Sequence, residues 1–440
     1  MMLRVLLLLA LCLPAGAAEK AFPYHYDLHE FPNGLRLVTV PTEFPNVVAL
    51  YIVVRTGSRN EVEPGHTGFA HLFEHMMFRG TKRFPPDRYE QVLKETGASS
   101  NAYTSDDRTV YHTTFSKEDL GTILDMEADR FQNLAYSPED FKTETLAVLG
   151  EYNKNSAAPT NKLEEVLRDT AFDRHTYKHT TMGFERDIRN MPTMYDYSRR
   201  FFDHYYRPEY TTMIVVGDVT ADNTRALVEK YWGGWKRGDF QAQIPVEPPQ
   251  QGPRTNQIKW PSPTLPWVWV AFHGPAYSDT AKDQTTLDVI NFLGFSENSP
   301  LYTKLVINEQ KVDVLEADNA DHKDPELFMV VARVKKQEDV DYVRDQILAT
   351  LAEFRDKPVE AKRLSDVKSN LRYRFALGLD NSEAIADTLA HFLSLADTPE
   401  TINKVYDLYD AVTPADIQAM ARKYFADNGR TIVTLSGGAR

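Results

Sequence analysis

The two halves of this 440-residue chain end in the same order of elements, and this repetition constrains the fold more than any other feature. Residues 201–218 read as an aromatic helix end, a turn and an apolar strand, and residues 421–438 repeat that order. The strands close on Gly217 and Gly437, which lie about half a chain apart. The sequence therefore indicates a duplication that produced two domains of similar topology.

The halves also begin alike, and a linker separates them. Residues 47–54 and 267–273 are β-branched and aromatic runs, and both are expected to be strands. Residues 239–253 are rich in Pro and Gln and lack periodicity, which is typical of an extended linker. We therefore expect an N-terminal domain over residues 19–238, a linker over 239–256 and a C-terminal domain over 257–440.

Residues 1–18 have the pattern of a secretory signal peptide. A short basic start is followed by an apolar run over 5–13, and small residues allow cleavage after Ala17 or Ala18. An uncleaved membrane anchor is the alternative, but the run is too short to span a bilayer. We expect a periplasmic or secreted protein without a membrane anchor. The single cysteine, Cys12, lies in this segment, so the mature chain has no disulfide.

The net charge of -13 argues against a nucleic-acid partner, because such surfaces need clusters of Lys and Arg. Most of this charge is expected to lie on the solvated surface.

The strongest chemical signal is the stretch His71-Leu72-Phe73-Glu74-His75. On a helix, residues four apart share a face and Glu74 lies beside them, so two imidazoles and a carboxylate converge. Neutral His nitrogens bind zinc, and a carboxylate beside the metal can take a proton from water. The order is the inverse of the commoner His-Glu-x-x-His helix. The alternative is one partly buried His with a His and a Glu on the surface.

A third ligand is expected from a helix that begins after Ser137, with Pro138 at its first position. Glu144 and Glu151 are seven residues apart and share a face of that helix. Glu151 is a candidate zinc ligand, and Glu144 is a candidate acceptor that orients a ligating His. The alternative is a solvated acidic face.

With these residues identified, the chain resembles the pitrilysin and mitochondrial processing peptidase family of zinc peptidases. Residues 68–81 are similar to that family's metal-binding helix and the Gly-Thr turn after it, and residues 101–105 resemble its substrate-binding edge strand. Glu151 lies at the distance from His75 that the family's third ligand has, and Glu144 matches its acid beside the ligands. The resemblance covers nearly the whole mature chain.

The resemblance implies an α+β protein with two tandem homologous α/β-sandwich domains. It implies one zinc per chain, held by His71, His75 and Glu151, with Glu144 behind them. Only the first half carries the His-x-x-Glu-His pattern, so the second domain would shape the cleft without binding zinc.

The mechanism expected from these residues is hydrolysis of peptides by a zinc endopeptidase. Zinc would polarise water and the scissile carbonyl, and Glu74 would pass the water proton to the leaving amine. A strand at the sheet edge would pair with an extended peptide through its backbone. The residues expected to contact the substrate are Ser99, Ser100, Asn101, Ala102 and Tyr103.

The sequence departs from the family in its second half. Active members usually carry there an Arg and a Tyr seven residues apart that contact the substrate, but Val306 and Asp313 occupy these positions. Since the family's chamber is built from four such domains, we expect a heterodimer with a related subunit that carries the Arg/Tyr pair, and otherwise a homodimer.

Three alternatives remain at this point. The chain is compatible with a non-catalytic scaffold or peptide-binding subunit, although all the ligands and the base are present. Metal storage has little support, because only one site is evident. His175 and His179 have ligand spacing, but their surroundings favour a loop rather than a second metal site.

Overall fold

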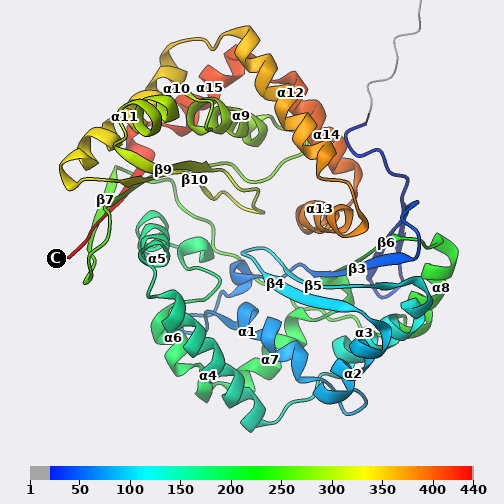
Figure 1. Ribbon diagram of the computed structural model, residues 1–440. Coiled ribbons are helices and arrows are strands. Elements are labelled where there is room, and N and C mark those ends of the chain that lie inside the picture. The colour runs from blue at the N-terminus through cyan, green and yellow to red at the C-terminus, as the bar shows by residue number, and fades with distance from the viewer. Residues whose placement is uncertain (1–19, 439–440) are drawn as a thin grey trace, which may run out of the picture.

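The computed structural model describes residues 20–438, which form two domains joined by an extended segment (Figure 1). The predicted signal peptide, residues 1–18, lies outside the described residues. Within residues 20–438 the first sheet has six strands in the order β1-β2-β6-β3-β5-β4, and the second has five in the order β7-β11-β8-β10-β9. No helix in this part of the chain is both long and apolar enough to cross a membrane.

The two sheets share one pattern of pairing, which confirms the predicted duplication. In the first sheet, β6 lies between β2, to which it is parallel, and β3, to which it is antiparallel. In the second sheet, β11 lies in the same way between the parallel strand β7 and the antiparallel strand β8. The predicted strands at 47–54 and 267–273 are β3 and β8. The strands are β1 (Asp27–Glu30), β2 (Arg36–Pro41), β3 (Val47–Val54), β4 (Ser99–Thr104), β5 (Thr109–Ser116), β6 (Thr211–Gly217), β7 (Arg254–Lys259), β8 (Trp267–His273), β9 (Val312–Asp318), β10 (Leu327–Val334) and β11 (Arg430–Ser436).

Most helices pack on the outer face of their own sheet, so the two sheets face each other across a layer formed by α5 and α13 (Figure 1). The helices of the first domain are α1 (Phe69–Met76), α2 (Pro86–Thr96), α3 (Leu120–Asn133), α4 (Pro138–Asn155), α5 (Pro159–Ala171), α6 (Glu185–Asn190), α7 (Tyr195–Tyr205) and α8 (Ala221–Trp232). Those of the second are α9 (Asp283–Phe295), α10 (Pro300–Tyr302), α11 (Val340–Asp356), α12 (Ala361–Leu377), α13 (Ser382–Leu395), α14 (Glu400–Ala411) and α15 (Pro414–Tyr424).

Helices α5 and α13 are exchanged between the domains. The α13 helix of the second domain lies on β3 and β6 of the first sheet, where its Leu389 packs with Tyr51. The α5 helix of the first domain lies on β7 and β11 of the second sheet, where its Leu167 packs with Trp269 of β8. The central strands are therefore buried on both faces, and such strands read as continuous apolar runs rather than alternating ones.

The extended segment between the domains contains no helix or strand over residues 239–253. Glu247 fixes it by accepting the backbone N–H groups of Asp173 and His175 at 2.7 and 2.9 Å. The predicted linker end at residue 256 requires a correction, because β7 begins at Arg254. Arg254 pairs with Thr431 of the parallel strand β11, and this pairing holds the backbone extended whatever the local composition.

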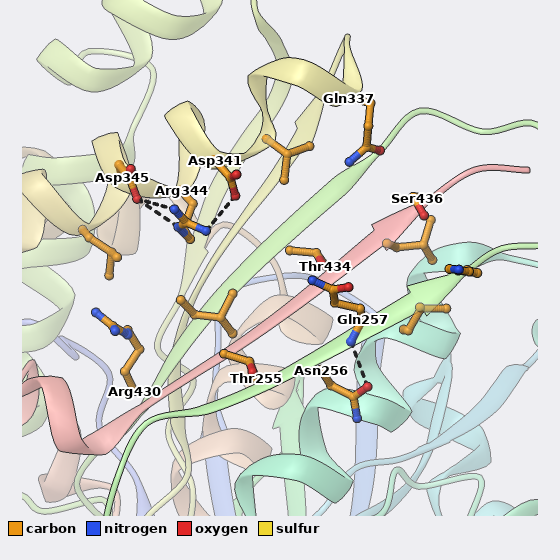
Figure 2. A pocket seen from close by; sticks show the side chains of 16 residues that line it. Thr255, Asn256, Gln257, Gln337, Asp341, Arg344, Asp345, Arg430, Thr434 and Ser436 are labelled. Carbon is orange, nitrogen blue, oxygen red and sulfur yellow. Dashed lines mark hydrogen bonds and ion pairs between the residues drawn. The ribbon is translucent and has the colours of Figure 1, made fainter.

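The second domain is more open than the first at one sheet edge. In the first domain β1 pairs with β2, and α8 packs on β2 beside α3. Neither element has a counterpart among the described residues of the second domain, and a groove of about 570 Å³ lies between β7, β11 and α11. Figure 2 shows its polar lining, in which Arg344 pairs with Asp341 and Asp345. The lining contains no His, Cys or Glu, and its two Asp side chains both pair with Arg344.

Candidate metal centre

The predicted zinc residues meet at the contact between α1 and α4. Figure 1 shows where these two helices lie in the first domain. Helix α4 begins as predicted, because Ser137 and Asp140 cap each other's backbone N–H groups and Pro138 follows at the first position. Helix α1 presents its two histidines on the side that faces α4. The long apolar face of α1 is buried in the first domain's core, which holds this helix against the sheet.

Three donor atoms converge at this contact. The Nε2 atoms of His71 and His75 each lie 3.5 Å from Oε2 of Glu151, and one donor atom from each residue lies within 4.8 Å of the others. Ligands about 2.0–2.2 Å from a tetrahedral zinc ion are about 3.3–3.6 Å apart. Both nitrogen–oxygen distances therefore match those between two ligands of one zinc ion, and three protein ligands would leave one position of a tetrahedral site open. Within residues 20–438 no other group of His, Cys, Asp and Glu is placed to hold a metal.

The two histidines differ in how they are held. Burial, together with the neighbouring His75, lowers the pKa of His71 to about 4, so its imidazole is neutral at pH 7, the form that binds metal. Its Nδ1 atom is buried and has no hydrogen-bond partner among the described residues. The Nδ1 atom of His75, by contrast, lies 3.4 Å from Oε2 of Glu144.

Glu144 fixes the orientation of His75. Its hydrogen bond with His75 raises the pKa of that imidazole and lowers the pKa of Glu144 itself. With Nδ1 turned to the carboxylate, Nε2 of His75 points to Glu151. The side chain of Arg79 also donates to Glu144 and so supports this acid from the far side. The sequence identified Glu144, but it did not identify Arg79.

Glu74 lies beside the three donors without joining them. Its Oε2 atom accepts a hydrogen bond of 2.6 Å from the hydroxyl of Thr104, at the end of β4. Burial raises the pKa of Glu74 above the ordinary value, which brings this carboxyl closer to the pKa of an effective general base at neutral pH. Thr104 was not predicted, although strand alternation from the buried Ala102 places it on the same face of β4.

A cavity of about 360 Å³ opens over these residues. Its carboxylates are Glu74, Glu151, Glu164 and Glu165, and the lining contains no Lys or Arg. Arg168 and Lys162 lie behind the two outer acids, at 3.2 Å from Glu164 and 3.0 Å from Glu165. Of the remaining lining residues, only His71 and Tyr103 were predicted from the sequence. The others, apart from Thr104, are Tyr152, Asn155, Ser156, Asn161, Thr180, Thr181 and Met182.

The predicted substrate strand forms one edge of the first sheet. β4 pairs with β5 alone, so its other side has free backbone groups for an extended peptide. Of the five predicted contact residues, Tyr103 lines the cavity, while Ser99 and Asn101 are exposed and Ala102 is buried. Ser100 is half-buried, and its hydroxyl accepts a hydrogen bond from Thr113.

Two other predictions concern residues away from this centre. Nε2 of His175 lies 2.9 Å from Asp324, and Nδ1 of His179 lies 3.0 Å from the carbonyl of Thr180, so each ring has a structural contact and they form no second metal group. In the second domain Val306 packs on the core and Asp313 pairs with Arg333 at 2.8 Å. These two positions therefore supply no Arg or Tyr to a substrate.

Comparison with known families identifies both domains. Residues 36–185 match the sequence model of Insulinase (Peptidase family M16), and residues 194–371 match that of the Peptidase M16 inactive domain. The first region contains all the candidate zinc residues.

Individual relatives match over most of their length. The zinc protease PqqE of Helicobacter pylori is 29% identical, with 95% of this chain and 94% of that protein covered. The mitochondrial-processing peptidase subunit beta of Blastocladiella emersonii is 22% identical, with 92% of this chain and 87% of that protein covered. The crystal structure of a protease from Helicobacter pylori is 27% identical, covers 94% of this chain and 99% of its own, and superposes with a TM-score of 0.87.

Proposed function

Because the chain belongs to the M16 family of peptidases, we propose that it is a zinc-dependent endopeptidase that cleaves peptides or unfolded polypeptide segments. The observation that carries this proposal is that two imidazole nitrogens each lie 3.5 Å from the same carboxylate oxygen of Glu151, with the separate, partly buried carboxyl group of Glu74 beside them. A structural zinc site is usually closed by four protein ligands, whereas catalytic sites keep three and an open position.

Each residue of the site has a separate role in the proposed reaction. His71, His75 and Glu151 would hold the zinc, which when bound supplies Lewis-acid polarisation of water and the scissile carbonyl. Glu74 accepts the proton of the attacking water and returns it to the leaving amine. Thr104 keeps the Glu74 carboxylate turned toward the cavity by its hydrogen bond.

Substrate binding is proposed to combine backbone pairing with charge. An extended peptide would pair with the free edge of β4, which places few demands on its sequence. The lining of the cavity has four carboxyl groups and no Lys or Arg, so it favours a basic side chain near the cleaved bond. A peptide library digested with the purified protein tests this, and a preference for acidic residues at every subsite would contradict it.

We further propose that the protein acts after export, in the periplasm or outside the cell, with a related subunit. The relative named as subunit beta of the mitochondrial-processing peptidase supports a heterodimer, as does the presence of Val306 and Asp313 where an Arg and a Tyr are expected. The alternative is a homodimer. Co-purification from the native host, followed by assays of this chain alone and recombined, decides between them. Full activity of the isolated chain, unchanged by any related subunit, would contradict the heterodimer.

The metal assignment has its own test. The purified mature protein is expected to hold about one zinc per chain, and His71→Ala or Glu151→Ala is expected to remove it, since a lost ligand removes much of a site's affinity. Glu139→Gln, at an exposed acid of the same helix α4, is the matched control. Full zinc content in both ligand variants would refute this set of ligands.

A further inference from the structure

The metal-binding helix α1 begins without a capping side chain of its own. Its N-cap residue is Gly68, which has a φ of +90°, and a Cβ there would lie 2.6 Å from the carbonyl oxygen of Met182. No other residue can therefore replace this glycine and supply a cap. The first N–H groups of a helix have no partner within it, so they need an acceptor from elsewhere.

A single side-chain carboxyl group provides that acceptor. Oε2 of Glu61 accepts the N–H of Gly68 and Oε1 accepts the N–H of Ala70, both at 2.7 Å. The Glu61 side chain is fully buried in the first domain. Both oxygens are directed at the positive end of the helix dipole, one residue before His71.

The ring of His71 depends on this backbone for its position. His75 is oriented by Glu144, but Nδ1 of His71 has no hydrogen-bond partner among the described residues. Ligating histidines are usually oriented by such a partner. The placement of the His71 ring is therefore set by packing and by the first turn of α1, which Glu61 holds.

Glu61 itself is held from both domains. It follows the short helical turn Ser58–Asn60, in which the Ser58 hydroxyl donates to Asp106 at 2.7 Å. In the same turn, Nε of Arg59 donates to Asp324 at 2.6 Å. Asp324 belongs to the β9–β10 loop of the second domain, so this loop braces the turn that carries Glu61.

We propose that Glu61 is a positioning residue of the metal centre, which fixes the first turn of α1 so that His71 meets His75 and Glu151. Glu61 contacts neither the metal nor the substrate. The proposal rests on the proposed zinc peptidase function. It also gives the second domain, which lacks zinc ligands of its own, a part in forming the site.

The test is Glu61→Gln, which keeps the size of the side chain but turns an amide N–H₂ group toward the backbone donors. Zinc affinity is measured by chelator competition, the cobalt(II) absorption spectrum reports ligand geometry, and kcat and KM are measured at saturating zinc. Zinc binding is expected to weaken by about 10- to 100-fold, as for other supporting partners of metal ligands. The kcat is expected to fall while KM stays within about twofold, because the substrate surface is untouched.

Two controls separate positioning from general stability. Glu63→Gln makes the same change at a partly exposed carboxylate two residues away and is expected to match the wild type. Leu351→Ala lowers the unfolding temperature from the core of the second domain, and the folded protein is expected to keep normal zinc affinity. If Glu61→Gln fails to fold, Ser58→Ala loosens the same turn and is expected to weaken zinc binding severalfold.

The outcomes are distinct. If the wild type binds no zinc, the proposed function fails. If the wild type binds zinc and the zinc affinity and cobalt spectrum of Glu61→Gln match those of Glu63→Gln, the positioning role is wrong. The positioning role is also wrong if Glu61→Gln loses stability but keeps normal zinc affinity, as Leu351→Ala is expected to do. If Glu61→Gln does not fold, a normal zinc affinity in folded Ser58→Ala protein contradicts the role instead.

Discussion

At the level of single residues, the surroundings of Glu74 set the pKa of the proposed general base. Burial raises the pKa of this carboxyl, and the hydrogen bond from Thr104 lowers it again in part. These two effects together keep Glu74 available for a proton.

Thr104→Val is therefore expected to lower kcat by about 10- to 150-fold, since a hydrogen bond to a charged group contributes about 1.5–3 kcal/mol. The substitution also raises the pKa of Glu74, and because the base must be deprotonated, the acidic limb of the kcat/KM profile moves to higher pH. Thr104→Ser keeps the hydroxyl and is expected to behave nearly as wild type. A profile of Thr104→Val that superposes on the wild-type profile would rule out this role.

At the level of elements, the sequence predicts a good part of what the structure shows. The strands β3 and β8, the duplication and the capped start of α4 were all evident from local patterns. The exchange of α5 and α13 was not, because an amphipathic helix shows that it covers a sheet but not which sheet. Glu61, Arg79 and Thr104 were missed because their partners are hydrogen-bonding groups whose contacts depend on tertiary packing.

The exchange of helices predicts how the domains unfold. Leu389→Ala in α13 removes a fully buried side chain from the first domain's sheet and is expected to cost about 2–5 kcal/mol. Since a helix of each domain packs on the sheet of the other, chemical denaturation of Leu389→Ala should remain a single transition, with a midpoint below that of the wild type. Leu377→Ala, at a side chain that is 58% exposed, is the matched control and should change stability by less than about 0.5 kcal/mol. Two separate transitions in the wild type would contradict this coupling.

On the scale of the whole molecule, a buried network of charges joins the domains. His322 in the β9–β10 loop lies 3.1 Å from Asp106 of the first domain, which also pairs with Arg168 at 3.1 Å. Burial alone would lower the pKa of His322, but its hydrogen bond with Asp106 and the nearby Glu326 raise it to about 10. The protonated imidazole therefore stabilises the contact between the domains.

This network predicts a pH dependence of stability. The pKa of an unfolded histidine is about 6.5, so the stabilisation by His322 is complete below that pH. It declines as the pH rises toward 10 and is lost above the folded-state pKa. His322→Gln should lower the free energy of unfolding by about 2 kcal/mol at pH 6, and this difference should shrink steadily by pH 9. A difference between the two proteins that grows with pH would show that the histidine is neutral in the fold.

The central claim is that Glu74 acts as the base beside a zinc ion held by His71, His75 and Glu151. The most direct measurement is the zinc content and peptide cleavage rate of Glu74→Gln and wild-type protein, prepared side by side and, where required, with the same partner subunit. The amide is nearly isosteric but cannot accept the proton of water, so about one zinc per chain and a cleavage rate lower by at least about 100-fold are expected. Near-normal cleavage by a zinc-loaded Glu74→Gln protein would contradict the account.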